Sequence, residues 1–332
     1  MQKGNTQKKQ RMKYSLLNWK ESCLFRLFRN SQILIPLLFI LCFASFFVPH
    51  FMVKDNILNI LRQISVLSLI SIGSTLVIIT GGIDLSVGSV MALVAVYTAT
   101  AVKAGTSFWI IFPVAILFGM LIGMVNGILI MNFTIPPFIV TLAVMTIGRG
   151  LVLLRTGGSN ITELGNKAFL FLGRGFLLGI PFPIIILFVF YLFWSIVLNN
   201  TRFAREVYAI GNNEEASKVA GIAVRRVILY VYMIAGMMAS VGAVIDTSRM
   251  NTVTAMYGNG IEFDCVTAVV LGGASLDGGS GRVMNTLYGA ALLGIINNLF
   301  NLLGVSTYWG QIVKGLILIL AVMTNTTLKR RD

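Results

Sequence analysis

The strongest constraint on this chain is a series of apolar segments, most of them long enough to cross a lipid bilayer. A helix of roughly 20 apolar residues spans the hydrocarbon core, where unpaired backbone groups are too costly for open structures. The sequence therefore predicts an all-α polytopic membrane protein with about ten transmembrane helices. The segment 264–276 is short, so it is either a span or a re-entrant segment. The predicted spans are residues 33–53, 57–80, a third ending near 102, 108–131, 136–154, 181–198, 227–247, 264–276, 283–303 and 308–323.

Basic residues mark one side of the predicted membrane domain. The chain has 26 lysines and arginines against 12 acidic residues. They gather in an N-terminal tail (1–30), a polar loop (199–226) and a C-terminal tail (327–332), which leaves one transmembrane domain over 31–326. An even number of predicted spans separates each basic region from the next, so all three lie on one side. Because basic loops stay in the cytoplasm, both termini are predicted to be cytoplasmic, and no nucleic-acid partner is needed to explain the charge.

Groups that carry out catalysis or bind metals are scarce. His50 is the only histidine, and Cys23, Cys42 and Cys265 are scattered, which indicates neither a disulfide framework nor a metal site. A membrane enzyme needs a base beside a nucleophile or a ligand cluster, and the sequence offers neither. The glycine-rich residues 278–282 lack the lysine and serine of a phosphate-binding loop. We expect no enzyme activity, metal or cofactor on this chain.

Two glycine-rich segments interrupt the apolar pattern. GGIDLSVG (81–88) aligns without gaps on GGASLDGG (272–279), and GMVNG (123–127) is paralleled downstream by GIINN (294–298). We infer broken helices and a weak internal repeat, a combination that points to a transport path. The glycines expected to break the helices are Gly81, Gly82, Gly88, Gly272, Gly273 and Gly279.

Polar residues in and near the broken segments are the candidates for lining that path. They are Asp84, Ser86, Asn126, Asn297, Asn298 and Asn301. An ionisable residue at membrane depth usually faces a cavity or a partner. Asp84 therefore lines the path, caps the restarted helix by accepting from its backbone, or does both, and Ser86 is a second candidate cap. For each asparagine the alternative role is an interhelical hydrogen bond.

The polar loop 199–226 contains a short predicted helix over residues 213–221. An Asn-Asn pair precedes Glu214 and Glu215, which supplies an N-cap and puts two carboxylates at the positive end of the helix dipole. Gly221 is expected to end the helix. Spacing alone is equally consistent with an ordinary solvated helix between two spans.

Four stretches together resemble the membrane permease subunit of bacterial ABC-type monosaccharide importers, with ribose permeases as the nearest type. They are VIITGGIDLSVGSVMAL (77–93), REVYAIGNNEEASKVAGIAVRRV (205–227), VVLGGASLDGGSGR (269–282) and NNLFNLLGVSTYWGQIVKGLILILAV (297–322). The similarity covers about residues 55–325. The motifs are specific as a set, whereas any one glycine motif is common in membrane helices.

The resemblance implies a role for the polar loop. In this family the loop between the sixth and seventh spans holds a coupling helix that docks on an ATPase. The expected coupling residues are Glu214, Glu215, Ala216, Ser217 and Gly221. The family pattern is glutamate, then two small residues, then glycine four residues later, and residues 215–221 match it. The third position is usually alanine and is serine here, which is also small.

The resemblance also implies the partners and location of the chain. These are a second copy of the chain, two copies of an ATP-binding subunit that carry the ATP and magnesium, and an extracytoplasmic sugar-binding protein. The location is the bilayer of the bacterial cytoplasmic membrane, and the cargo is a small neutral sugar such as ribose. Whether the second permease is identical or a related chain stays open, as does the particular sugar.

The alternative function is an ion-coupled secondary transporter of a small polar solute, because such transporters also use repeats and broken helices. That function predicts ionisable relays inside the spans. Apart from Asp84, the sequence largely lacks them.

Overall fold

The computed structural model describes residues 33–329, so the predicted N-terminal tail (1–30) and residues 330–332 lie outside the described part. Its regular secondary structure is helical except for two pairs of two-residue strands. The helices are α3 (Leu34–Phe47), α4 (Lys54–Ile79), α5 (Val87–Lys103), α6 (Phe108–Phe133), α7 (Pro137–Thr156), α8 (Lys167–Arg174), α9 (Phe182–Asn200), α10 (Arg202–Asn212), α11 (Glu214–Val219), α12 (Val224–Met250), α13 (Ile261–Leu271), α14 (Val283–Leu302) and α15 (Thr307–Lys329).

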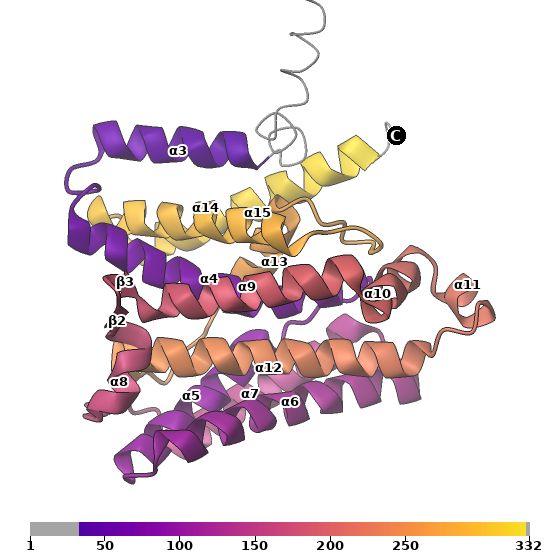
Figure 1. The fold of residues 1–332 in the computed structure, drawn as a ribbon, viewed down its shortest axis with the longest axis horizontal. Coiled ribbons are helices and arrows are strands. Elements are labelled where there is room, and N and C mark those ends of the chain that lie inside the picture. The colour runs from indigo at the N-terminus through magenta and orange to yellow at the C-terminus, as the bar shows by residue number, and fades with distance from the viewer. Residues whose placement is uncertain (1–32, 330–332) are drawn as a thin grey trace, which may run out of the picture.

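The strands pair antiparallel in two small ribbons. β1 (Ile161–Thr162) pairs with β4 (Thr252–Val253), and β2 (Phe176–Leu177) pairs with β3 (Ile180–Pro181). Figure 1 shows β2, β3 and α8 at one end of the long helices, opposite α11.

Six of the described helices are long and apolar enough to cross a membrane: α4, α6, α7, α9, α12 and α14. Three shorter apolar helices are α3, α5 and residues 308–324 of α15. The eighth predicted segment is α13, whose 11 residues extend only about 16 Å, roughly half the hydrocarbon core. The structure thus confirms an all-α architecture with several candidate spans, while the count of about ten stays a prediction.

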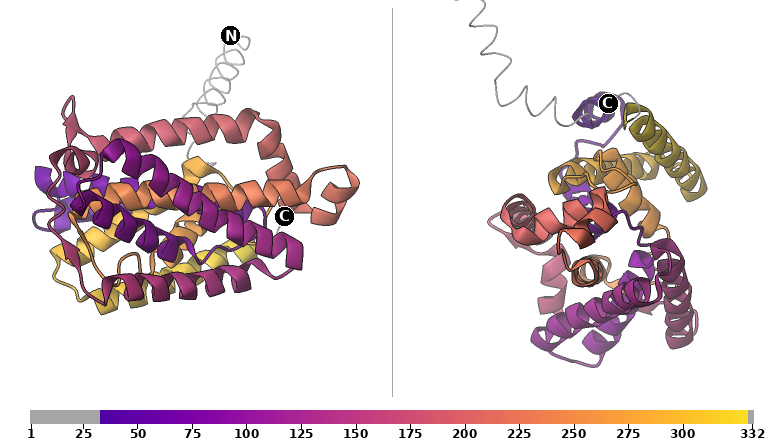
Figure 2. Two further views of the ribbon diagram at one scale, coloured as in Figure 1. Left: turned by 90° about the horizontal axis from the view of Figure 1, so that it is seen from below. Right: turned by 90° about the vertical axis from the view of Figure 1, so that its right-hand side faces the viewer.

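The core is built from α4 and α12. Their apolar stretches are 89% and 72% buried, against 22% for α6 and α7 and 28% for α9. Seen end-on in Figure 2, α3 and α15 lie at one edge of the molecule and α6 and α7 at another. Along α4, small serines recur every three residues and are all buried, which lets neighbouring helices approach closely: Ser65, Ser68, Ser71 and Ser74.

The closest helix pairing joins α6 to α12 through glycines. A Cβ atom added at Gly119 would collide with the backbone of Gly236 and the side chain of Ser240, and one added at Gly123 with the backbone of Tyr232. The small-residue spacing of α6 is therefore a packing seam, as its sequence predicts.

We expect Gly119→Ala to destabilise the protein in detergent by about 1–3 kcal/mol, because the new methyl group forces two backbones apart. Gly150→Ala on α7 is the matched control, since no atom lies within 4 Å of the added carbon. It should change stability by no more than about 1 kcal/mol. Thermal unfolding of the two variants checks this, and equal melting temperatures would contradict the close approach of α6 and α12.

Candidate functional site

The chain leaves the helical path between α4 and α5. Gly82 N–H donates to the Val77 carbonyl (3.0 Å) and Gly81 N–H to the Ile78 carbonyl (2.9 Å), while Gly81 has a φ of +80°. This helix-ending geometry favours glycine in the left-handed position. The predicted break is present, and Gly81 and Gly82 form it.

Gly88 has a different role from the one predicted. It lies inside α5 and does not break the helix. A Cβ atom there would collide with the Glu262 side chain and the Gly258 carbonyl oxygen, so the glycine allows α13 and the loop before it to pack against α5. Sequence spacing does not distinguish a glycine that breaks a helix from one that permits close contact.

Three of the path candidates form one buried hydrogen-bonded chain. Asp84 Oδ1 accepts from the Ser86 backbone N–H (2.8 Å) and from the Ser86 hydroxyl (2.6 Å). Asn126 on α6 in turn donates from Nδ2 to Ser86 Oγ (2.8 Å). Asp84 therefore satisfies a backbone group at the start of α5, and the Ser86 side chain makes no cap bond. These hydrogen bonds also fasten the broken segment to α6.

The second glycine-rich segment ends α13 in the same way. Ala274 N–H donates to the Val269 carbonyl (3.2 Å), and Gly273 has a φ of +83°. Gly272 is the C-cap residue directly after α13 and has a φ of −65°. By backbone conformation Gly81 thus corresponds to Gly273, whereas the ungapped sequence alignment pairs Gly81 with Gly272. Because this ending is common to many helices, the internal repeat stays a prediction.

The two glycine-rich segments meet at the end of α4. Gly279 N–H donates to the Ile79 carbonyl, the last residue of α4, over 2.8 Å. Gly279 has a φ of +73°, and a side chain there would collide with Asn212 on α10. The Tyr208 hydroxyl, also on α10, donates to the Gly281 carbonyl (2.8 Å). Both segments are therefore joined to each other and to the polar loop.

That polar loop folds into α10 and α11, and α11 projects from the end of the molecule (Figure 1). Asn213 caps α11 by accepting from the Ala216 N–H (2.9 Å), as its position predicts. Ser217 is buried, and its hydroxyl donates to the Asn213 carbonyl (2.8 Å). Gly221 follows α11 with a φ of +81°, and nothing lies within 4 Å of its missing side chain.

The carboxylates of α11 are paired within the helix. Lys218 Nζ lies 2.9 Å from Glu214 Oε1 and 2.8 Å from Glu215 Oε1. Hydrogen bonds that Lys218 donates to the carboxylates of Glu215 and Glu214 raise the pKa of Lys218, so it stays charged at neutral pH. The surface of α11 therefore presents a compact cluster of both charges.

Val219 was not singled out by its sequence. It ends α11 and is 90% exposed, an apolar side chain at the tip of a polar projection. An isolated valine in a charged loop carries no sequence signal, because its exposure depends on where the helix points.

The asparagines of α14 do not join this site. Asn298 and Asn56, in the first turn of α4, exchange hydrogen bonds between their amides (2.6 and 3.1 Å). Asn298 is thus an interhelical link, at the opposite end of α4 from the broken segment. Asn297 is half-buried and Asn301 is exposed on the same helix.

A cavity of about 440 Å³ lies between the broken segment and α11. The end of α4, the α6–α7 turn, α11 and α12 line this cavity. Its lining residues include Thr80, Gly81, Gly82, Thr134, Pro136, Glu214, Lys218, Arg225 and Tyr232. Among the described residues, no group of three or more His, Cys, Asp or Glu side chains is placed to hold a metal.

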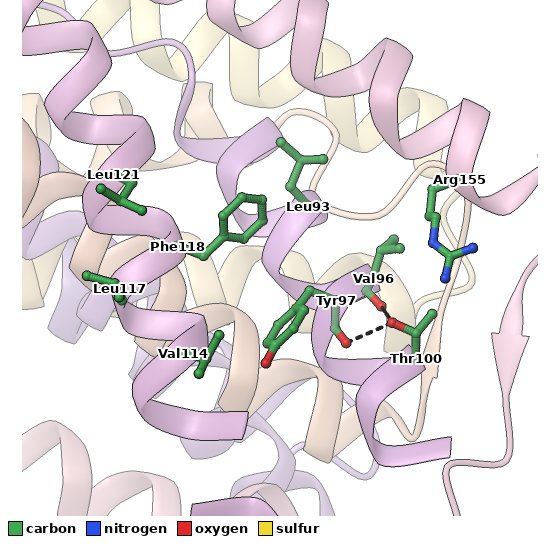
Figure 3. A pocket seen from close by; sticks show the side chains of 9 residues that line it. All are labelled: Leu93, Val96, Tyr97, Thr100, Val114, Leu117, Phe118, Leu121 and Arg155. Carbon is green, nitrogen blue, oxygen red and sulfur yellow. Dashed lines mark hydrogen bonds between the residues drawn. The ribbon is translucent and has the colours of Figure 1, made fainter. Parts of the chain in front are cut away.

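A second cavity, shown in Figure 3, is apolar. Its floor is α5 and one wall is α6, with Arg155 of α7 at its rim. The Thr100 hydroxyl donates to the carbonyls of Val96 and Tyr97 (2.9 Å each), so it is not free for a ligand. With few free polar groups, this cavity does not suit a hydroxylated ligand.

Comparison with known proteins connects this arrangement to transport. Residues 56–322 match the family described as branched-chain amino acid transport system / permease component. The chain is 42% identical to the ribose import permease protein of Bacillus subtilis, over 84% of this chain and 87% of the relative. It is 39% identical to the ribose import permease protein of Haemophilus influenzae, over 89% and 92%.

A further relative is the L-arabinose ABC transporter permease protein of Azospirillum brasilense, 32% identical over 90% of this chain and 88% of the relative. No solved structure matches the chain. The relatives confirm the resemblance carried by the sequence motifs, and the match includes both glycine-rich segments and the polar loop. The chain is therefore a multi-pass membrane transport subunit rather than an enzyme, and it belongs to the permease component family of the branched-chain amino acid transport type.

Proposed function

We propose that this chain is the permease subunit of an ATP-binding-cassette importer that moves a small neutral sugar, of the ribose type, across the bacterial cytoplasmic membrane. The observation that carries the proposal is a series of contacts: α10, which leads into the projecting α11, is bonded to the second glycine-rich segment, and that segment is bonded to the end of α4 where the first break begins. The names of the relatives support a pentose as cargo. They also favour this function over an ion-coupled secondary transporter.

The proposed assembly has two copies of this chain, two ATP-binding subunits that carry ATP and magnesium, and an extracytoplasmic sugar-binding protein. About ten spans with both termini in the cytoplasm place α11 on the ATPase side. Glu214, Glu215, Ala216, Ser217 and Gly221 are the proposed coupling residues, with Val219 added from the structure.

The coupling step follows from the contacts of α10. A push on α11 reaches α10, because Asn213 both ends α10 and caps α11. Tyr208 and Asn212 of α10 contact the loop that carries Gly279 and Gly281. Since Gly279 is bonded to the end of α4, movement of α10 changes the position of both broken segments together.

The path itself is proposed to use weak, exchangeable hydrogen bonds with sugar hydroxyls. Asp84, Ser86 and Asn126 are bonded to one another and buried, and they stay candidates for the path although they are not among the residues that line the cavity next to α11. Asn297 and Asn301 stay candidates on α14, whereas the amide of Asn298 is hydrogen-bonded to Asn56.

We expect Val219→Asp to reduce the ATPase that co-purifies with the tagged chain by at least about tenfold, because a charge at a buried docking contact is costly. Leu178→Asp is the matched control, since Leu178 is equally exposed at the other end of the molecule. Quantitative mass spectrometry of the purified complexes checks this. Equal ATPase recovery from both variants would rule out α11 as the docking element.

The link from α10 to the second glycine-rich segment has its own test. Tyr208→Phe removes one hydrogen bond and should leave ATPase docking intact, while lowering the sugar imported per ATP hydrolysed by about fivefold. Tyr191→Phe is the control, because its hydroxyl donates to the Ser68 carbonyl in the core (3.1 Å). Reconstituted vesicles measure both quantities. An unchanged ratio for Tyr208→Phe would show that this bond does not transmit the coupling.

The roles of Asp84 are separated by two substitutions. Asp84→Asn keeps an oxygen that accepts from Ser86 and should keep melting temperature and uptake close to wild type. Asp84→Ala removes the acceptor and should cost about 1–2 kcal/mol of stability. If Asp84→Asn abolishes uptake at an unchanged melting temperature, the charge itself is required and capping is not the main role.

A further inference from the structure

A second group of charges lies on the first turn of α13 and reaches α7 on one side and α15 on the other; its Glu262 side chain lies against Gly88. Arg149 Nη2 of α7 is 3.8 Å from Glu262 Oε2 of α13. Lys314 Nζ of α15 is 2.7 Å from Asp264 Oδ2, two positions further along α13. The first turn of α13 thus carries two ion pairs that extend to helices on either side of it.

These charges lie at membrane depth and are not fully covered. Lys314 is seven residues, or about 10 Å, along α15 from its start, within an apolar helix. Its side chain is 28% exposed, and that of Arg149 is 21% exposed. A charge facing lipid costs several kcal/mol, so charged residues in spans almost always face water or a protein partner.

Other faces of the molecule are different. The sequences of α6 and α9 contain no charged residue, and their exposed side chains are large and apolar, such as Phe188, which is 68% exposed. Those faces suit lipid. The exposed side of α13, with its ion pairs to α7 and α15, therefore borders the aqueous path or the second copy.

An aromatic residue lies between the two α13 carboxylates in the sequence. Phe263 separates Glu262 from Asp264 in sequence and is 53% exposed. Glu262 is 3% exposed, and its Oε2 has no hydrogen-bond partner among the described residues. Lys314 has three N–H donors, of which its pair with Asp264 uses one. The cluster therefore combines an exposed apolar ring with unused donors of Lys314, while the Glu262 carboxylate is buried behind them.

We propose that Phe263, Asp264 and Lys314 form a sugar-contact site on the wall of the path, and that Arg149 with the buried Glu262 holds α13 in position behind it. This rests on the proposed function and adds a site to it. The ring covers the apolar C–H face of a small neutral sugar, and the charged groups exchange hydrogen bonds with its hydroxyls. A site with one aromatic surface and few polar groups binds weakly enough to release its cargo.

The first experiment measures access of water. In the full complex, with Cys23, Cys42 and Cys265 replaced by serine, Phe263→Cys and Phe188→Cys are treated with a membrane-impermeant thiol reagent from each side of the membrane. Labelling of Phe263→Cys, slowed by millimolar D-ribose, is expected, with none for Phe188→Cys. Two results overturn the proposal: no labelling of Phe263→Cys from either side, or a disulfide between its two copies without labelling.

The second experiment measures ATP-driven uptake of D-ribose. Phe263→Ala should lower it about tenfold, Phe263→Tyr should retain it, and Phe188→Ala should leave it unchanged. Equal uptake by Phe263→Ala and Phe188→Ala overturns the contact site while leaving the proposed function intact. If the wild-type complex shows no ATP-driven D-ribose uptake, the ribose-type cargo of the proposed function fails instead, and thiol labelling still decides whether this face is lined by water.

Discussion

The hydrogen bond from Gly279 N–H to the Ile79 carbonyl is the contact on which the functional architecture depends. A helix that ends inside a membrane protein leaves carbonyl groups that lipid cannot satisfy. At the end of α4 the last of these carbonyls is satisfied by a distant segment of the chain. That requirement draws residues 272–282 onto the broken segment, and the bare glycines there let α10 approach both. The polar loop is thereby fixed to the two places where the helices are interrupted.

The placement of polar groups follows the same constraint. Asp84 is buried, and its carboxylate is used by Ser86, which is in turn held by Asn126. Asn298 is satisfied by Asn56 in a reciprocal amide pair. Where charge stays partly exposed on an apolar helix, as at Lys314 of α15, it is paired with a carboxylate of a neighbouring helix. The helices α6 and α9, whose exposed side chains are large and apolar, contain no charged residue.

Local features could be predicted from the sequence because they depend on neighbouring residues. The segment positions follow from apolar run length, the break after α4 from paired glycines, and the cap of α11 from Asn213. The packing seam of α6 follows from its glycine spacing. Gly88 shows the limit of this approach. It lies inside a helix, and a larger residue there would collide with Glu262 and Gly258, which are distant in the sequence. Gly273, rather than Gly272, takes the left-handed position because α13 ends at Leu271 and Gly272 is its C-cap residue.

The sequence by itself determined the all-α membrane class, the family, the broken segments and the polar loop, because hydropathy, glycine pairs and charge clusters are properties of short stretches. Tertiary structure alone decided which of these stretches touch. It joined Asp84, Ser86 and Asn126 by hydrogen bonds, paired Asn298 with Asn56, exposed Val219 at the end of α11, and linked the first turn of α13 to α7 and α15 by ion pairs. Those outcomes depend on the packing of helices distant in the chain, and no local pattern records which side of a helix faces a partner.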